Sequence, residues 1–76
     1  MYNKQLDELS KRAKTKNQRL LVHSAELVLD ILASLEIYDY SITHDEYMSI
    51  ITICAQHKKR QLVYEITKEG FTWLQI

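Results

Sequence analysis

The sequence predicts an α+β fold dominated by helices, with two to three helices and a short C-terminal β-hairpin. Three observations predict it: a long helical stripe of apolar residues after residue 15, two capping-box patterns, and a strand-like alternation near the end of the chain. An all-α small bundle is the alternative. The 76 residues allow one small domain, residues 1–76, with a correspondingly small core.

Two helices are expected in the first half of the chain. Residues 3–14 read as a short polar helix, anchored by Leu6 and Leu9. Thr15 is the expected N-cap of a second helix that runs to about residue 36, because Gln18 completes a capping box with it. The apolar residues of this helix recur every three or four positions, on a face so broad that it needs partners on more than one side. That face contains Leu21, Ala25, Val28, Leu32 and Leu35, widened by Leu20, Leu27 and Ile31.

The middle of the chain predicts an extended segment and then a third helix. Residues 37–42 alternate between apolar or aromatic and polar side chains, which favours a short strand. Thr43 and Glu46 form a second capping box, so we expect a helix from there to about Lys59. Residues 50–53 are all β-branched and also fit a buried strand, but the cap favours the helix.

The C-terminal segment has two interpretations. Leu62, Tyr64 and Ile66 alternate with other residues as in a strand, and residues 67–70 have turn chemistry, with Gly70 at the position that favours a positive φ. Residues 71–76 then form the returning strand of a hairpin, which we prefer. In the competing interpretation Thr67 caps a last helical turn.

Composition excludes several classes of protein. With one cysteine the chain cannot form an internal disulfide, and with one glycine and no proline it is neither a phosphate-binding glycine loop nor a low-complexity linker. No apolar run is long enough to span a membrane. No basic and apolar leader opens the sequence, so we expect a cytoplasmic protein.

Two sets of reactive side chains are candidate sites. His23, Glu26 and Asp30 share one strip of the second helix, where a metal would need further ligands from another element. Cys54 and His57 stand three apart on the expected third helix, without an oxyanion hole or an orienting group for the histidine. We therefore expect no catalytic residues, no metal site and no cofactor, and a protein that is not an enzyme.

Charge is segregated along the sequence although its sum is zero. Residues 1–19 carry six basic against two acidic side chains, residues 20–46 six acidic and no basic ones, and residues 47–76 four basic against two acidic. Candidate nucleic-acid contacts are Lys11, Arg12, Lys14, Lys16, Arg19, Lys58, Lys59 and Arg60. Candidate partner-binding residues are the acidic Glu36, Asp39, Asp45 and Glu46 and the aromatic Phe71 and Trp73.

Two stretches resemble known families. Tyr-Ser-Ile-Thr-His-Asp-Glu from Tyr40, followed by an apolar stretch and Ala55-Gln-His-Lys-Lys-Arg-Gln-Leu-Val63, resembles the third-helix region of the Hha/YmoA family, small modulators that pair with the nucleoid protein H-NS. The resemblance implies an all-helical fold and a nucleoid protein as partner. The stretch from Tyr64 to Leu74 is similar to the end of winged-helix regulators, where a wing strand runs into a Thr-capped helix, and implies DNA binding.

Together these observations predict a small interaction protein that modulates transcription or nucleoid function by binding another protein. Self-association as a dimer is expected, because pooling two small cores offsets the weak burial of one. One alternative is a DNA-binding regulator of winged-helix type. The other is a phage- or plasmid-type inhibitor, whose acidic segment occupies a basic groove on a host nucleic-acid-handling protein.

Overall fold

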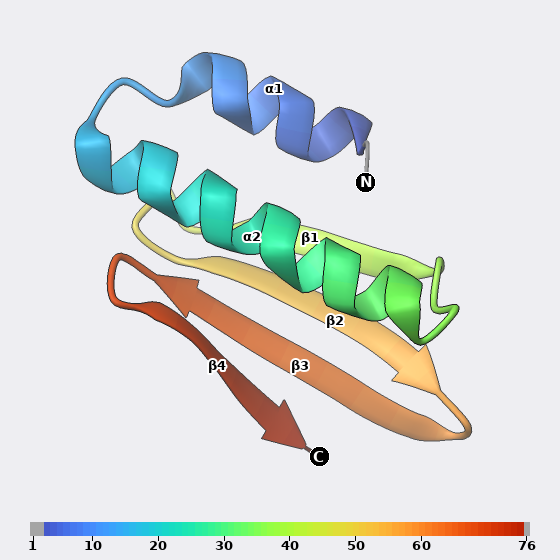
Figure 1. The fold of residues 1–76 in the computed structure, drawn as a ribbon. Helices are drawn as coiled ribbons and strands as arrows, with labels where there is room; N and C mark the ends of the chain where they lie inside the picture. The colour runs from blue at the N-terminus through green and yellow to red at the C-terminus, as the bar shows by residue number, and fades with distance from the viewer. Residues whose placement is uncertain (1–2, 76) are drawn as a thin grey trace.

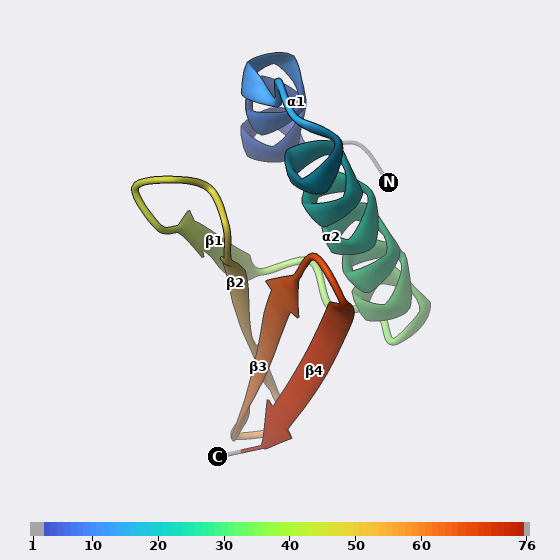
Figure 2. The same cartoon turned by 90° about the vertical axis from the view of Figure 1, so that its left-hand side faces the viewer.

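The computed structural model describes residues 3–75, which fold as two helices followed by a four-stranded antiparallel sheet. The helices are α1 (Lys4–Arg12) and α2 (Lys16–Ser34), and the strands are β1 (Tyr40–His44), β2 (Ile51–His57), β3 (Arg60–Thr67) and β4 (Gly70–Gln75). Sequential strands are neighbours in the order β1-β2-β3-β4, and both helices lie on the same side of the sheet (Figures 1 and 2). The α+β class is confirmed. The prediction that helices dominate was wrong, because strands make up about as much of the chain as helices do. The all-α alternative is excluded.

The beginnings of both helices are defined by side-chain caps. The Asn3 side chain accepts a hydrogen bond from the Leu6 amide at 3.0 Å and starts α1. Thr15 and Gln18 form the predicted capping box: Thr15 Oγ1 accepts from the Gln18 amide at 3.1 Å, and Gln18 Oε1 accepts from the Thr15 amide at 3.2 Å. The two helices predicted from the sequence are therefore confirmed.

The end of α2 is a Schellman motif built without glycine. The Ile37 amide donates to the Leu32 carbonyl and the Glu36 amide donates to the Ala33 carbonyl, both at 2.9 Å. Glu36 takes the left-handed position with φ 60°, and Ile37 and Leu32 are both buried. This motif turns the chain from α2 towards the sheet.

The predicted third helix was wrong, because this segment forms the β1–β2 loop and β2. Thr43 lies in β1 and caps nothing, and Asp45 instead organises the loop. Its Oδ1 accepts from the amides of Ser49 at 2.6 Å and Ile50 at 2.8 Å, and its Oδ2 accepts from the Ser49 hydroxyl at 2.6 Å. The β-branched residues that follow prefer an extended backbone, and their alternation buries every second side chain of β2 against the helices.

The β2–β3 and β3–β4 connections are both tight turns. His57 and Arg60 are paired across a two-residue turn in which Lys58 and Lys59 have φ of 51° and 67°. Thr67 pairs with Gly70, whose φ of 126° agrees with the predicted role of the glycine. The predicted hairpin is therefore confirmed, although it is part of a larger sheet. The last residue of its predicted returning strand, Ile76, lies outside the described residues.

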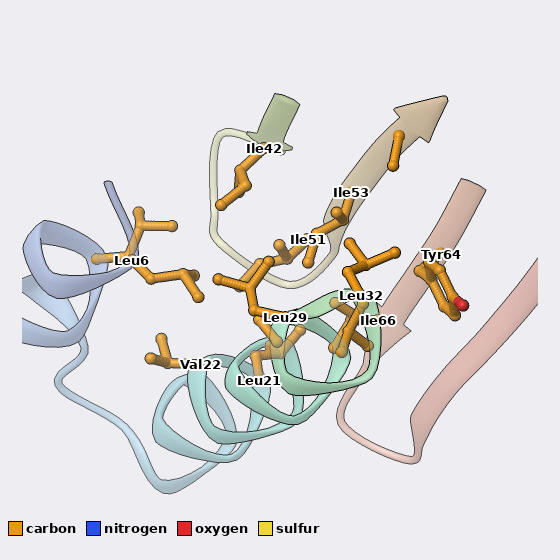
Figure 3. Close-up of a cluster of buried hydrophobic side chains, with 14 of the residues drawn as sticks. Leu6, Leu21, Val22, Leu29, Leu32, Ile42, Ile51, Ile53, Tyr64 and Ile66 are labelled. Atoms are coloured by element: carbon orange, nitrogen blue, oxygen red, sulfur yellow. The ribbon is translucent and has the colours of Figure 1, made fainter. Parts of the chain in front are cut away.

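The core fills the space between the helices and one face of the sheet (Figure 3). The side chains shielded most completely come from α2, β2 and β3: Leu21, Val28, Leu29, Leu32, Ile51, Ile53 and Ile66. The helices leave the second face of the sheet uncovered (Figure 2). Within residues 3–75, no helix is both long and apolar enough to cross a membrane.

Candidate functional site

The two sets of reactive side chains do not assemble into a reactive centre. Residues of β2 alternate between the sheet faces, so Cys54 and His57, three apart, project from opposite faces. Cys54 lies on the uncovered face, beside a shallow depression of about 300 Å³. His23, Glu26 and Asp30 are all exposed on α2, and the described residues contain no group of three or more histidine, cysteine or acidic side chains able to hold a metal ion.

The acidic candidates do not form one surface. Glu36 and Asp39 lie between α2 and β1, whereas Asp45 and Glu46 lie in the β1–β2 loop, at the other end of β1. Figure 1 shows these two connections at opposite ends of the molecule. Hydrogen bonds from Ser49 and Ile50 lower the pKa of Asp45 to about 2, and the geometry of these bonds makes Asp45 part of the loop's own structure.

The basic candidates are divided in the same way. One group surrounds the connection between α1 and α2, and the other occupies the β2–β3 turn; these lie at opposite ends of the molecule (Figure 1). The first group comprises Lys11, Arg12, Lys14, Lys16 and Arg19, and the second Lys58, Lys59 and Arg60. Near the first group lies the acidic β1–β2 loop, since Gln18 Nε2 donates to the Tyr47 carbonyl at 3.4 Å. Charge that is segregated along the sequence is therefore intermixed in space.

The most extensive candidate site is apolar, and it runs from one flank of α2 to β4. Leu20, Leu27, Ile31 and Leu35 are 37–47% exposed, and their spacing places them along one flank of the helix. The opposite flank, with Val22 and Leu29, faces α1, near Leu6 (Figure 3). The exposed flank is therefore directed towards β4, on which α2 packs.

Two aromatic side chains continue this surface onto the sheet. Phe71 and Trp73 of β4 are 41% and 55% exposed. They are paired with Ile66 and Tyr64 of β3, which are buried beneath the helices, so both aromatic residues lie on the helix-covered side of the sheet. We call Leu20, Leu27, Ile31, Leu35, Phe71 and Trp73 together the apolar surface.

The ring of Tyr64 holds the aromatic part of this surface in place. It stacks on Trp73 with ring centroids 6.3 Å apart and planes inclined by 16°, and it meets Phe71 edge-on at 6.2 Å. Burial raises the pKa of Tyr64 above 10.0. Phe71 and Trp73 are thus exposed side chains supported from below by a buried ring, which limits the rotamers that they can adopt.

The two edge strands of the sheet, β1 and β4, differ in whether other groups cover them. At the β1 edge, Gln5 Nε2 of α1 donates to the Ile42 carbonyl at 2.6 Å, and Asn3 Nδ2 donates to the Tyr40 hydroxyl at 3.4 Å. β4 is the opposite edge, and its sequence Gly-Phe-Thr-Trp-Leu-Gln has neither a charge nor a proline. Alternate backbone N–H and C=O groups of such an edge strand point away from the sheet and can pair with another chain.

Sequence reasoning found part of the apolar surface. It singled out Phe71 and Trp73, and the structure exposes both. It assigned Leu20, Leu27 and Ile31 only to the broad face of α2, without showing that this flank would stay exposed. The available signal was the width of the apolar face of α2, which one side of a four-stranded sheet and a nine-residue helix cannot cover.

Comparison of the chain with protein-family models, with curated proteins and with solved structures found no match. The segment that resembles the third helix of the Hha/YmoA family, residues 40–63, forms β1, β2 and the start of β3. The segment that is similar to the end of winged-helix regulators forms β3, a turn and β4, and Thr67 stands at the turn and caps no helix.

Proposed function

We propose that this chain is a non-enzymatic interaction protein, which acts by binding another protein chain through the apolar surface. The observations that carry the proposal are the exposed apolar flank of α2, which is directed towards β4, and the exposed Phe71 and Trp73 on that edge strand. Aromatic and aliphatic side chains concentrated in this way are typical of the buried centre of protein–protein interfaces.

The edge strand supports the same proposal. Large apolar side chains that stay in water do not stabilise the folded chain, which is one cost. An uncharged edge strand that can pair with any other strand and so lead to aggregation is a second cost. β1 is shielded by Gln5, whereas β4 has no such shield among the described residues. A partner that covers β4 and the flank of α2 would remove both costs at once.

Modulation of transcription or nucleoid function stays our proposal for the setting in which such binding acts. It does not depend on any single basic or acidic patch, since both kinds of charge are divided between the ends of the molecule.

The proposal is tested by the size of the complex that the chain forms in the cells that naturally make it. An epitope-tagged wild-type chain is compared with the double variant Leu27→Lys, Trp73→Lys by size-exclusion chromatography of gentle extracts. We expect the wild type to elute as a complex and the variant to elute near the 9.0 kDa of one chain. Tyr38→Lys places the same charge on another exposed aromatic position and is the control. A wild-type chain that elutes alone, or a complex that survives the double variant, would exclude this surface as the binding site.

A further inference from the structure

We propose that the occupant of the apolar surface is a second copy of this chain, which pairs its β4 antiparallel to the β4 of the first copy. The inference rests on the proposed function and names its partner. Pairing of the two β4 strands joins the four strands of each copy into one continuous eight-stranded sheet, with both pairs of helices on the same side.

The geometry of the edge favours this arrangement. Two identical antiparallel edge strands related by a two-fold axis present the same backbone groups to each other, so the contact is self-complementary and closed. The six residues of β4 extend over about 20 Å, which is long enough to form a stable strand pair. Closure also explains why β4 needs no charge or proline to prevent open-ended association.

The helices come within reach of each other in the same arrangement. α2 packs across β2, β3 and β4, so two such helices on either side of the β4–β4 junction stand roughly 15 Å apart, about three strand spacings. Large side chains fill a gap of this width. Leu27 and Ile31 of each copy then face Trp73 or the other helix across the junction.

The exposed area is sufficient for a specific dimer. At roughly 200 Å² for a free leucine or isoleucine and more for an aromatic residue, the exposed fractions of the apolar surface amount to roughly 600 Å² on each copy. The backbone and turn residues of the edge strand add to this area. A standard interface buries about 800 Å² per partner, and homodimer interfaces are more apolar than others.

The charges on α2 are complementary in this orientation. Its first turn carries Lys16 and Arg19 and no acidic residue, its last turn carries no basic residue, and Glu36 follows its end. This distribution opposes the dipole of its own helix. A two-fold axis perpendicular to the sheet makes the two α2 helices antiparallel, which brings the basic beginning of one helix towards the acidic end of the other. The arrangement that is unfavourable within one chain becomes favourable between two.

The first test measures the mass and the tryptophan emission of the purified full-length chain as functions of concentration. Multi-angle light scattering should give twice the 9.0 kDa mass. Trp73 is the only tryptophan, so its emission should shift to the blue as the dimer forms. Trp73→Lys and Leu27→Lys should each raise the dissociation constant by roughly 30-fold or more, as expected for residues at the centre of an interface. Tyr38→Lys should leave it unchanged, and circular dichroism confirms that each variant is folded.

A charge exchange tests the orientation independently of the apolar contacts. Lys16→Glu alone and Glu36→Lys alone should each weaken self-association by roughly three- to tenfold, because each places two like-charge pairs in the dimer. Mixing the two variants should restore association as a heterodimer, since both pairs are then of opposite sign. Recovery on mixing is specific to antiparallel helices, and no recovery would overturn the proposed orientation.

Cysteine cross-linking tests the strand pairing itself. In a Cys54→Ser background, single cysteines at positions 71 to 74 are oxidised one at a time. Residues near the two-fold axis meet their own copies closely enough for a disulfide, so a strong cross-link at one or two neighbouring positions is expected. Equal cross-linking at all four positions, or at none, would overturn β4 pairing.

The outcomes separate the two proposals. A purified chain that stays monomeric in every assay, but elutes in native extracts as a complex that depends on Leu27 and Trp73, overturns the dimer and leaves the interaction function standing. A dimer that is unaffected by Trp73→Lys and Leu27→Lys places the contact elsewhere and overturns the inference. A chain that is monomeric in both settings overturns both proposals.

Discussion

Trp73 and Tyr64 are paired directly across β4 and β3, and their rings stack although one is 55% exposed and the other only 5%. The pair thus joins the hydrophobic core to the apolar surface. The stability of this ring pair should depend on the aromatic ring of Tyr64 and hardly on its hydroxyl group. The burial that raises the pKa of Tyr64 destabilises only the ionised form of the side chain.

Tyr64→Ala is expected to lower the free energy of unfolding by about 3–5 kcal/mol, as for other buried aromatic residues. Tyr64→Phe should change it by no more than about 0.5 kcal/mol. Urea denaturation at low protein concentration, followed by circular dichroism, measures both. A loss of similar size in the two variants would mean that the hydroxyl, and not the ring, supports Trp73.

The raised pKa of Tyr64 also predicts an alkaline pH dependence. The unfolded chain ionises its tyrosine near pH 10.0, before the folded chain does, so the stabilisation is fully present below pH 10 and is lost as the pH rises through the folded pKa. The thermal midpoint of the wild type should therefore fall more steeply above pH 10 than that of Tyr64→Phe. Parallel curves for the two proteins would show that Tyr64 contributes nothing to this loss.

The lowered pKa of Asp45 predicts that folding stability is lost at acidic pH. Its hydrogen bonds with Ser49 and Ile50 lower its pKa from 3.8 to about 2. Its contribution to stability is therefore present above about pH 4 and lost as the pH falls towards 2. Thermal unfolding between pH 2 and 6 should show a smaller decline for Asp45→Asn than for the wild type. Glu46→Gln removes the neighbouring carboxylate and should retain the wild-type decline.

The sequence predicted those elements whose signals are local. The capping box of Thr15 and Gln18 fixes the start of α2, and Gly70 fixes a hairpin turn; both depend on residues three or fewer positions apart. The prediction of a third helix was wrong because Thr43 and Glu46 match the capping-box pattern without forming a cap. Asp45 instead forms a competing set of hydrogen bonds with Ser49 and Ile50. The pairing of Ile51 and Ile53 with β3 then fixed the strand.

The candidate site was predictable only in part, for a related reason. The aromatic surplus at Phe71 and Trp73 is visible in the sequence. Which flank of α2 stays exposed depends on where α1 docks, and that is set by contacts such as Gln5 with Ile42, 37 residues apart. The separation of Glu36 from Asp45 likewise follows from β1, which lies between them. A short strand was predicted there over residues 37–42, but the helix predicted after it was wrong.

Neighbouring leucines of α2 should respond very differently to truncation. Leu29 is fully buried against α1 and the sheet, so Leu29→Ala should cost about 2–5 kcal/mol of the free energy of unfolding, much of the stability of a chain this small. Leu27 is 44% exposed, and Leu27→Ala should cost the folded monomer below about 1 kcal/mol while weakening self-association. Chemical denaturation and light scattering separate these effects. Equal losses of folding stability would mean that Leu27 belongs to the core of one chain.

The β2–β3 turn offers a way to stabilise the protein without touching the apolar surface. Lys58 and Lys59 both have positive φ, which lysine adopts at a cost and which asparagine and glycine adopt readily in a two-residue hairpin. The double variant Lys58→Asn, Lys59→Gly should therefore raise the free energy of unfolding by about 1 kcal/mol. Glu69→Gly is the matched control, because the β3–β4 turn carries its positive φ at Gly70. That control should bring no gain, since it only adds freedom to the unfolded chain. Urea denaturation of the wild type and the two variants at one protein concentration measures these changes, and a gain from Glu69→Gly equal to that of the double variant would contradict the assigned turn geometry.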